Sequence, residues 1–235
     1  EDDDIERVVG AVPGVASRSE DGFGLRPNIG IRGANSDRSA KITLMEDGIL
    51  LAPAPYAAPA AYYFPMTTRL VGVEVFKGAA ATRFGPQTVG GAINLLTREI
   101  PDGPAAFADL SAGLRNTYKV HAWAGTRGER TGVLAEGVHL RSGGFKILDN
   151  GGPTGFDQSE IMLKSEWSPL AGHLLAWKLG FANQTSHETY LGLTGADLEE
   201  TPYRRYAASQ LGLMEWNRTQ AEMAWTVARG EGFQL

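Results

Sequence analysis

The sequence predicts two regions of different architecture: a mixed α/β region over residues 1–101 and a set of antiparallel, membrane-type β-strands over residues 102–235. Short strand-like runs in the first region alternate with loops rich in Gly, Pro and Ala. Segments of about ten residues in the second region alternate apolar and polar side chains, as membrane β-strands do. The change falls at the turn signal Pro101-Asp102-Gly103-Pro104.

The first region is expected to hold one short helix and three strands. They cover residues 5–12, 42–45, 71–76 and 90–97. The residues Glu46-Asp47-Gly48 predict a tight turn after the second of these segments. The uncharged stretch 48–68 is not expected to be a helix, because it contains Pro53, Pro55, Pro59 and Pro65. Each interior proline costs a helix about 3 kcal/mol.

The second region is expected to hold six strands, each with an apolar face. These faces carry Ala106, Ala108, Leu110, Ala112, Leu114, Val120, Ala122, Ala124, Ile161, Leu163, Trp167, Leu175, Trp177, Leu179, Phe181, Ala221, Met223, Trp225 and Val227. One segment, 133–141, departs from the pattern because Glu136 shares a face with Leu134 and Val138. A bulge or a different register is expected there.

The connections in this region are short at 128–131 and 169–172 and long at 142–157 and 187–218. Short turns on one side and long loops on the other are typical of outer-membrane barrels. A soluble β-sandwich domain with a binding or adhesion role also alternates apolar and polar residues, so it stays an alternative. Six strands leave unpaired edges in lipid, so a barrel would need further strands after Leu235.

Composition and motifs exclude several classes of function. The net charge of −5 gives no support for a nucleic-acid partner, and the absence of cysteine excludes disulfides and thiolate metal sites. Residues 78–85 lack the Gly-Lys-Ser/Thr of a phosphate loop, the four histidines lack metal-site spacing, and no Gly-x-Ser-x-Gly is present. We therefore expect no enzyme activity, no metal site and no cofactor. The chain starts at Glu1 without a visible signal peptide, so we expect it to be partial.

Five blocks in the first region carry a family resemblance. They are Arg26-Pro27-Asn28-Ile29-Gly30-Ile31-Arg32-Gly33, Leu44-Met45-Glu46-Asp47-Gly48-Ile49, Val73-Glu74-Val75-Phe76-Lys77-Gly78, Arg83-Phe84-Gly85-Pro86 and Gly90-Gly91-Ala92-Ile93-Asn94. In order and spacing they resemble the plug domain of TonB-dependent outer-membrane receptors. Three further stretches resemble the ferric dicitrate transporter branch, namely residues 52–65, Tyr190-Leu191-Gly192-Leu193 and Tyr203-Arg204-Arg205-Tyr206.

The resemblance implies a mixed α/β plug domain over 1–101, followed by the first six or so antiparallel transmembrane β-strands of a truncated barrel over 102–235. The whole barrel would have about 22 strands. The implied receptor lies in the outer membrane of a Gram-negative bacterium, surrounded by lipid. It imports a ferric chelate of the siderophore or ferric dicitrate type, driven by the partner TonB through a segment that this chain lacks. Cobalamin or another metal chelate stays an alternative ligand.

The same resemblance implies roles for individual residues. Arg32 matches the plug arginine that pairs with barrel glutamates, and Lys77 takes the second basic position of this plug–barrel lock. By position, the plug apices at 35–39 and 53–61 offer Arg38 to an anionic chelate and Tyr56 for stacking or hydrogen bonding. Arg18, in an earlier loop, is a further candidate ligand contact. Because Tyr56-Ala57-Ala58 offers no polar side chain besides the phenol, selectivity is expected to rest with Arg204, with Arg205 or with loops that this chain lacks.

Overall fold

The computed structural model describes residues 4–189 and 191–228 and divides into two compact units, residues 1–98 and residues 99–235. Tyr190, in one block of the resemblance, lies outside the described residues. Among the described residues, no helix is long and apolar enough to cross a membrane.

The first unit begins with helix α1, Ile5–Gly10. Asp4 caps it, since its Oδ1 accepts a hydrogen bond from the Glu6 amide at 2.8 Å. The helix is shorter than the expected range 5–12. Pro13 disfavours helical backbone in the residue before it, which accounts for the early end.

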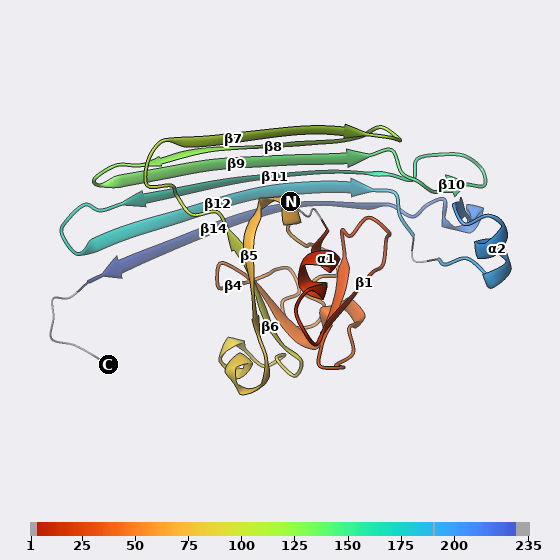
Figure 1. The fold of residues 1–235 in the computed structure, drawn as a ribbon, viewed down its shortest axis with the longest axis horizontal. Helices are drawn as coiled ribbons and strands as arrows, with labels where there is room; N and C mark the ends of the chain where they lie inside the picture. Colours follow the sequence, from red (N-terminus) through yellow and green to blue (C-terminus); the bar gives the residue numbers. More distant parts are fainter. Residues whose placement is uncertain (1–3, 190, 229–235) are drawn as a thin grey trace. The chain divides into compact units, whose positions relative to one another are not determined.

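The strands of the first unit form two small sheets. The strands are β1 Val15–Ser19, β2 Pro27–Ile31, β3 Ile42–Glu46, β4 Ile49–Leu50, β5 Leu70–Phe76 and β6 Gly91–Thr97. β1 and β2 pair antiparallel, and the other four form a sheet in the order β4-β3-β6-β5, in which β3 and β6 run parallel (Figure 1). Short 3-10 helices lie at Asp37–Ser39, Thr67–Arg69 and Gly78–Phe84. As expected, residues 48–66 contain no helix; they include the two residues of β4, and the second 3-10 helix begins at Thr67.

Two local features fix the larger sheet. Asp47 and Gly48 have φ angles of 48° and 83°, the left-handed pair that a two-residue turn between β3 and β4 requires. At the start of β6, a Cβ on Gly91 would lie only 2.5 Å from the Phe76 carbonyl oxygen. Only glycine therefore lets β5 and β6 approach at that point. The sheet buries a core of aliphatic side chains, among them Ile42, Leu44, Ile93 and Leu95.

The second unit contains one six-stranded antiparallel sheet, whose spatial order follows the chain (Figure 1). Its strands are β7 Ala105–Gly113, β8 Thr117–Arg127, β9 Thr131–Ser142, β11 Phe156–Trp167, β12 His173–Ser186 and β14 Met214–Val227. The connections 128–130 and 168–172 are short, whereas 143–155 and 187–213 are long. The expected mixed α/β region followed by antiparallel strands is confirmed.

The register corrects the expectation for β9. The pairing of β9 with β8 and with β11 is continuous along its length, so there is no bulge. Glu136 lies opposite Trp123 and Met162, on the face that carries the polar residues of the neighbouring strands. Leu134 joins a small apolar cluster on that face with Ile100 and Met162. The alternation was misread because this strand has apolar residues on its polar side.

The long connections have structure of their own. The 143–155 connection contains β10 Ile147–Leu148, and the 187–213 connection contains helix α2 Gly195–Glu200, strand β13 Arg204–Arg205 and a 3-10 helix at Ala207–Ser209. β10 and β13 pair in parallel, with Ile147 opposite Arg204. The two long connections are therefore joined to each other.

Candidate functional site

The two bases expected to form a lock are brought together in the first unit. Arg32 follows β2, and its amide donates a hydrogen bond to the Gly14 carbonyl at 2.8 Å. Lys77 follows β5, and its Nζ donates to the neighbouring Pro13 carbonyl. The Arg32 guanidinium reaches the residue after Lys77, because a Cβ on Gly78 would lie 3.2 Å from its Nη1. Within the described residues, neither base has a carboxylate partner.

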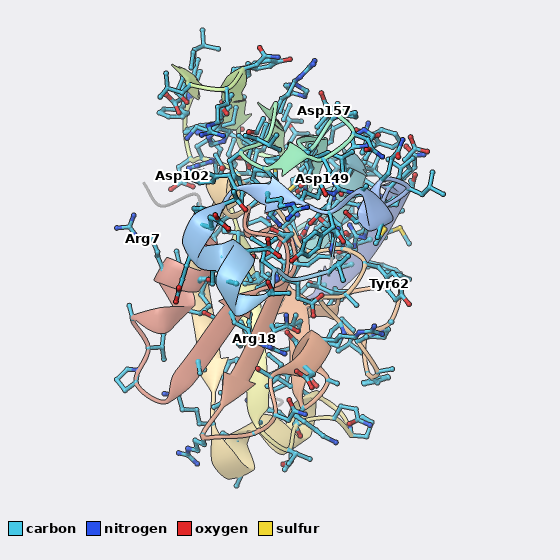
Figure 2. All side chains as sticks on the ribbon, turned by 90° about the vertical axis from the view of Figure 1, so that its right-hand side faces the viewer. Arg7, Arg18, Tyr62, Asp102, Asp149 and Asp157 are labelled. Atoms are coloured by element: carbon cyan, nitrogen blue, oxygen red, sulfur yellow. The ribbon has the colours of Figure 1, made fainter. Side chains whose placement is uncertain are left out.

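Arg18 pairs with Asp37, the residue that precedes Arg38 in the chain. Arg18, on β1 and labelled in Figure 2, forms an exposed ion pair with Asp37. The amide of Arg38 donates to the Oδ1 of Asn28, which fixes the backbone of the loop where Arg38 adopts a φ of 52°. The Arg38 side chain is exposed. Arg38 therefore presents its positive charge to solvent, whereas the charge of Arg18 is offset by Asp37.

Tyr56 lies in a different contact. Its ring is 38% exposed and rests against Gly85, where a Cβ would lie 3.1 Å from the ring's Cε1. Gly85 has a φ of 119°, which a side chain would strain. The phenol is thus held by the Arg83-Phe84-Gly85 turn and keeps a solvent-facing edge. The contacts do not place Tyr56 with Arg18 and Arg38 in one site.

A buried ion pair in the first unit escaped the sequence analysis. Arg69 donates from Nη2 to Glu46 Oε2 at 2.5 Å and to the Tyr63 hydroxyl at 3.1 Å. The two charged side chains are only 5% and 2% exposed. Nothing in the local pattern indicates this pair, because its members are 23 positions apart and Glu46 reads as part of a turn.

Arg204 and Arg205, expected to contribute to selectivity, both have partners within the second unit. Arg204 donates to Asp149 at 2.8 Å and to Asp197 at 2.8 Å. Arg205 is 2% exposed and donates to backbone and hydroxyl oxygens of its own connection, including Ser209 Oγ at 2.9 Å. Burial lowers the pKa of the Arg205 guanidinium. Neither side chain is presented as a free cation.

The side chains of His121 and His139, two of the four histidines, are hydrogen-bonded to neighbouring strands. His121 Nε2 lies 2.8 Å from Glu136 Oε1, and His139 Nδ1 lies 2.8 Å from Ser159 Oγ. No cluster of three His, Asp or Glu side chains that could hold a metal ion occurs among residues 4–189 and 191–228.

Comparison with known proteins identifies the first unit. Residues 1–92 match the family model of the TonB-dependent Receptor Plug Domain.

Solved receptors share the fold of most of the chain. The unliganded ferric citrate transporter FecA is 25% identical, with a TM-score of 0.69, over 85% of this chain and 31% of that chain. The siderophore receptor PirA from Acinetobacter baumannii is 15% identical, with a TM-score of 0.70, over 98% of this chain and 36% of that chain. The ferric yersiniabactin uptake receptor FyuA from Yersinia pestis is 18% identical, with a TM-score of 0.64, over 78% of this chain and 29% of that chain.

The chain thus spans about a third of the length of these receptors. It carries a TonB-dependent receptor plug domain, followed by antiparallel strands that share the fold of receptors of that family.

Proposed function

We propose that this chain is the plug, residues 1–101, and the first strands, residues 102–235, of an outer-membrane receptor that imports a ferric chelate of the siderophore or ferric dicitrate type. The observation that carries the proposal is the plug match over residues 1–92, together with the 25% identity to FecA over 85% of the chain. TonB is the proposed energy-coupling partner and a Gram-negative outer membrane the proposed location. The role is transport, and we assign no catalytic step to any residue.

The faces of the second sheet support a lipid partner. On one face, large apolar side chains such as Leu163, Leu179 and Met223 are exposed. On the other, Glu136, Glu160 and Lys178 are buried. A soluble β-sandwich buries its apolar face against a second sheet, so this inverted arrangement favours the membrane reading.

Arg38, Tyr56 and Arg18 are the proposed ligand contacts. Arg38 is favoured because its guanidinium is exposed and has no carboxylate partner among the described residues. Tyr56 offers a phenol edge held by the Gly85 turn. Arg18 is the weakest of the three because Asp37 offsets its charge.

Arg32 and Lys77 are the proposed plug–barrel lock. Their convergence at the Pro13–Gly14 turn makes them a joint site of two positive charges, which suits a pair of carboxylates. The fork of Arg32 can bind a carboxylate through two parallel hydrogen bonds, whereas Lys77 acts as a point charge.

The test is binding of ferric dicitrate, and of a panel of ferric siderophores, to the complete receptor in detergent. We expect Arg38→Ala and Tyr56→Ala each to weaken binding about tenfold, the cost of one contact of about 1.4 kcal/mol. Arg7→Ala, which removes an exposed charge in α1, serves as the control. Unchanged affinity in both test variants would remove the proposed apex contacts, and failure to bind any ferric chelate would remove the proposed ligand class.

A further inference from the structure

The two long connections of the second unit are tied together by their backbones. The Ile147 amide donates to the Tyr203 carbonyl at 2.7 Å, and the Asp149 amide donates to the Arg205 carbonyl at 3.0 Å. These bonds form the parallel pair of β10 and β13, which come from different connections. Figure 2 shows Asp149 beside the blue segment that carries β13. A two-residue pair this short needs side-chain support to persist.

Arg204 supplies that support with all three of its guanidinium nitrogens. Its Nε and Nη2 donate to the two oxygens of Asp149 at 2.8 and 3.2 Å, the two-pronged geometry that arginine forms with carboxylates. Its Nη1 donates to Asp197 Oδ1 at 2.8 Å. Asp197 belongs to helix α2, so a single guanidinium joins the 143–155 connection to α2 of the 187–213 connection.

Further contacts hold Asp197 in place. Its Oδ2 accepts hydrogen bonds from the Tyr206 hydroxyl at 2.5 Å and from the Thr194 hydroxyl at 2.8 Å. Arg204 lies over the ring of Tyr206, with its Cζ 5.0 Å from the ring centroid. The positive charge of Arg204 is therefore neutralised by Asp149 and Asp197, and the Tyr206 ring covers its guanidinium.

Arg205 is buried and donates hydrogen bonds to backbone carbonyls of its own connection. Its Nη2 donates to the carbonyls of Ser209 at 2.6 Å and Gly212 at 3.3 Å, and its Nη1 donates to the His187 carbonyl. His187 and Gly212 stand near the two ends of the connection, so this buried side chain closes it into a compact loop.

The short connection between β7 and β8 joins the same assembly. Arg115 donates from Nη1 to the Phe145 carbonyl at 2.7 Å, and its Cζ lies 5.4 Å from the centroid of the Tyr203 ring. Phe145 and Tyr203 meet edge to face at 6.4 Å. All three connections at this end of the sheet thus form one set of contacts, which we call the loop module, residues 114–116, 143–155, 187–189 and 191–213.

We propose that Arg204 and Arg205 are positioning residues that hold the loop module together as one body, and that they do not serve as cationic contacts for an anionic ligand. The part concerning the ligand rests on the proposed function, whereas the positioning role stands on the contacts alone. A guanidinium already engaged by two carboxylates has little charge to offer a third anion, and Arg205 is buried among carbonyls.

The first test measures the module without any ligand. The chain contains no cysteine, so Lys146→Cys and Leu198→Cys introduce one spin label in each long connection of the complete receptor, once any cysteine outside residues 1–235 has been replaced. We expect a single narrow distance distribution between the labels. Arg204→Ala and Asp149→Ala should both broaden it, and Glu199→Ala, an exposed carboxylate of α2, should leave it narrow. A distribution that stays narrow in both test variants would overturn the positioning role.

The second test distinguishes a positioning role from direct ligand contact by whether Asp149→Ala strengthens or weakens ligand binding. If Arg204 bound an anionic chelate such as ferric dicitrate, Asp149→Ala would tighten binding, because it removes a competing negative charge. A positioning role predicts that Asp149→Ala and Arg204→Ala weaken binding by a similar factor, about five- to fiftyfold. Arg204→Lys, which keeps the charge but loses the fork, should then be nearly as weak as Arg204→Ala.

Tighter binding in Asp149→Ala, or full affinity in Arg204→Lys, would overturn the proposal. If the unaltered receptor binds no ferric dicitrate, the proposed function loses its support for that chelate, and the label distances still decide the positioning role.

Discussion

The two units of this chain differ in which side chains they bury and which they expose. In the first unit, aliphatic residues such as Ile42 and Leu44 are buried, and the ion pair Arg69–Glu46 is buried as well. In the second unit, Met223 is 71% exposed on one face of the sheet, while Glu136 is 3% exposed on the other. The first arrangement suits a protein surrounded by water, and the second suits a sheet whose outer face meets hydrocarbon.

The difference teaches that the pattern of exposed apolar and buried charged side chains can distinguish a water-facing unit from one that, as proposed, meets lipid. A charge buried in the first unit must find its partner inside a small apolar core. A charge on the polar face of the second unit can find partners across neighbouring strands, as Lys119 does with Asp109 and Lys178 with Glu222. Mutations should therefore have costs that depend on the unit.

The largest effect is expected from Glu46→Ala, which leaves the Arg69 guanidinium buried without its carboxylate. Breaking a buried pair in this way typically costs about 3–5 kcal/mol. Hydrogen exchange of the β3 and β6 amides during denaturant titration measures it, since all five tryptophans lie in the second unit and do not report on the first. The matched control is Asp37→Ala, which breaks the exposed pair with Arg18 and should cost about 0–1 kcal/mol. Equal costs would contradict the expectation that burial in the core of the first unit makes the loss of a charge partner expensive.

A smaller effect is expected from Leu163→Arg, on the apolar face of β11. In a bilayer an arginine near the midplane costs a membrane β-sheet about 2–4 kcal/mol, whereas in water the same change at an exposed site is almost neutral. Unfolding titrations of the complete receptor in lipid vesicles give the cost. Leu170→Arg, also at an exposed leucine but in the short connection 168–172, is the control and should cost far less. A neutral Leu163→Arg would argue that this face does not meet lipid.

Two glycine substitutions are expected to act with opposite signs. Gly48→Ala should destabilise the first unit by about 1–2 kcal/mol, because φ is 83° and a Cβ there meets no other atom, so the whole cost is backbone strain. Gly10→Ala lies at the end of α1, also in open space, and should stabilise the unit by about 0.5–1 kcal/mol. The same exchange measurement compares them. A Gly48→Ala variant as stable as the unaltered chain would mean that the turn tolerates alanine.

The smallest effect concerns the loop module at acid pH. Hydrogen bonds from Arg204 and Tyr206 hold the pKa values of Asp149 and Asp197 below their usual 3.8. Because the folded pKa values are lowered, this stabilisation is complete above pH 3.8 and is lost as the pH falls through the lowered values. The mobility of a spin label at Lys146→Cys should therefore rise only below about pH 3.8. A label at Leu163→Cys should not change in this range, and loosening near neutral pH would refute the expectation.

Local patterns predicted much of the fold. The Asp47-Gly48 turn was predictable because few residues adopt two successive positive φ angles. The strands β11, β12 and β14 were predictable because their alternation is regular. β9 was misread at Glu136, since a strand's period of two shows which residues share a face but not which face is which.

The candidate site was less predictable because its contacts join distant segments. Arg204 and Asp149 are 55 positions apart, and only the pairing of β10 with β13 brings them together. Tyr56 was chosen for its place in the 53–61 loop, yet its contact with Gly85 follows from the fold. Residue types indicated which side chains were suited to binding, and the structure decided which of them had already been used by the protein itself.

The order of the six-stranded sheet has a kinetic consequence. Each strand pairs with the one that precedes it along the chain, from β7 to β14, interrupted only by the small strands β10 and β13. Even across the long connections 143–155 and 187–213, pairing of consecutive strands closes shorter loops than pairing of distant strands would, which favours faster formation of the sheet. The sheet can therefore assemble by adding one hairpin at a time, with the most recently added strand serving as the template for the next.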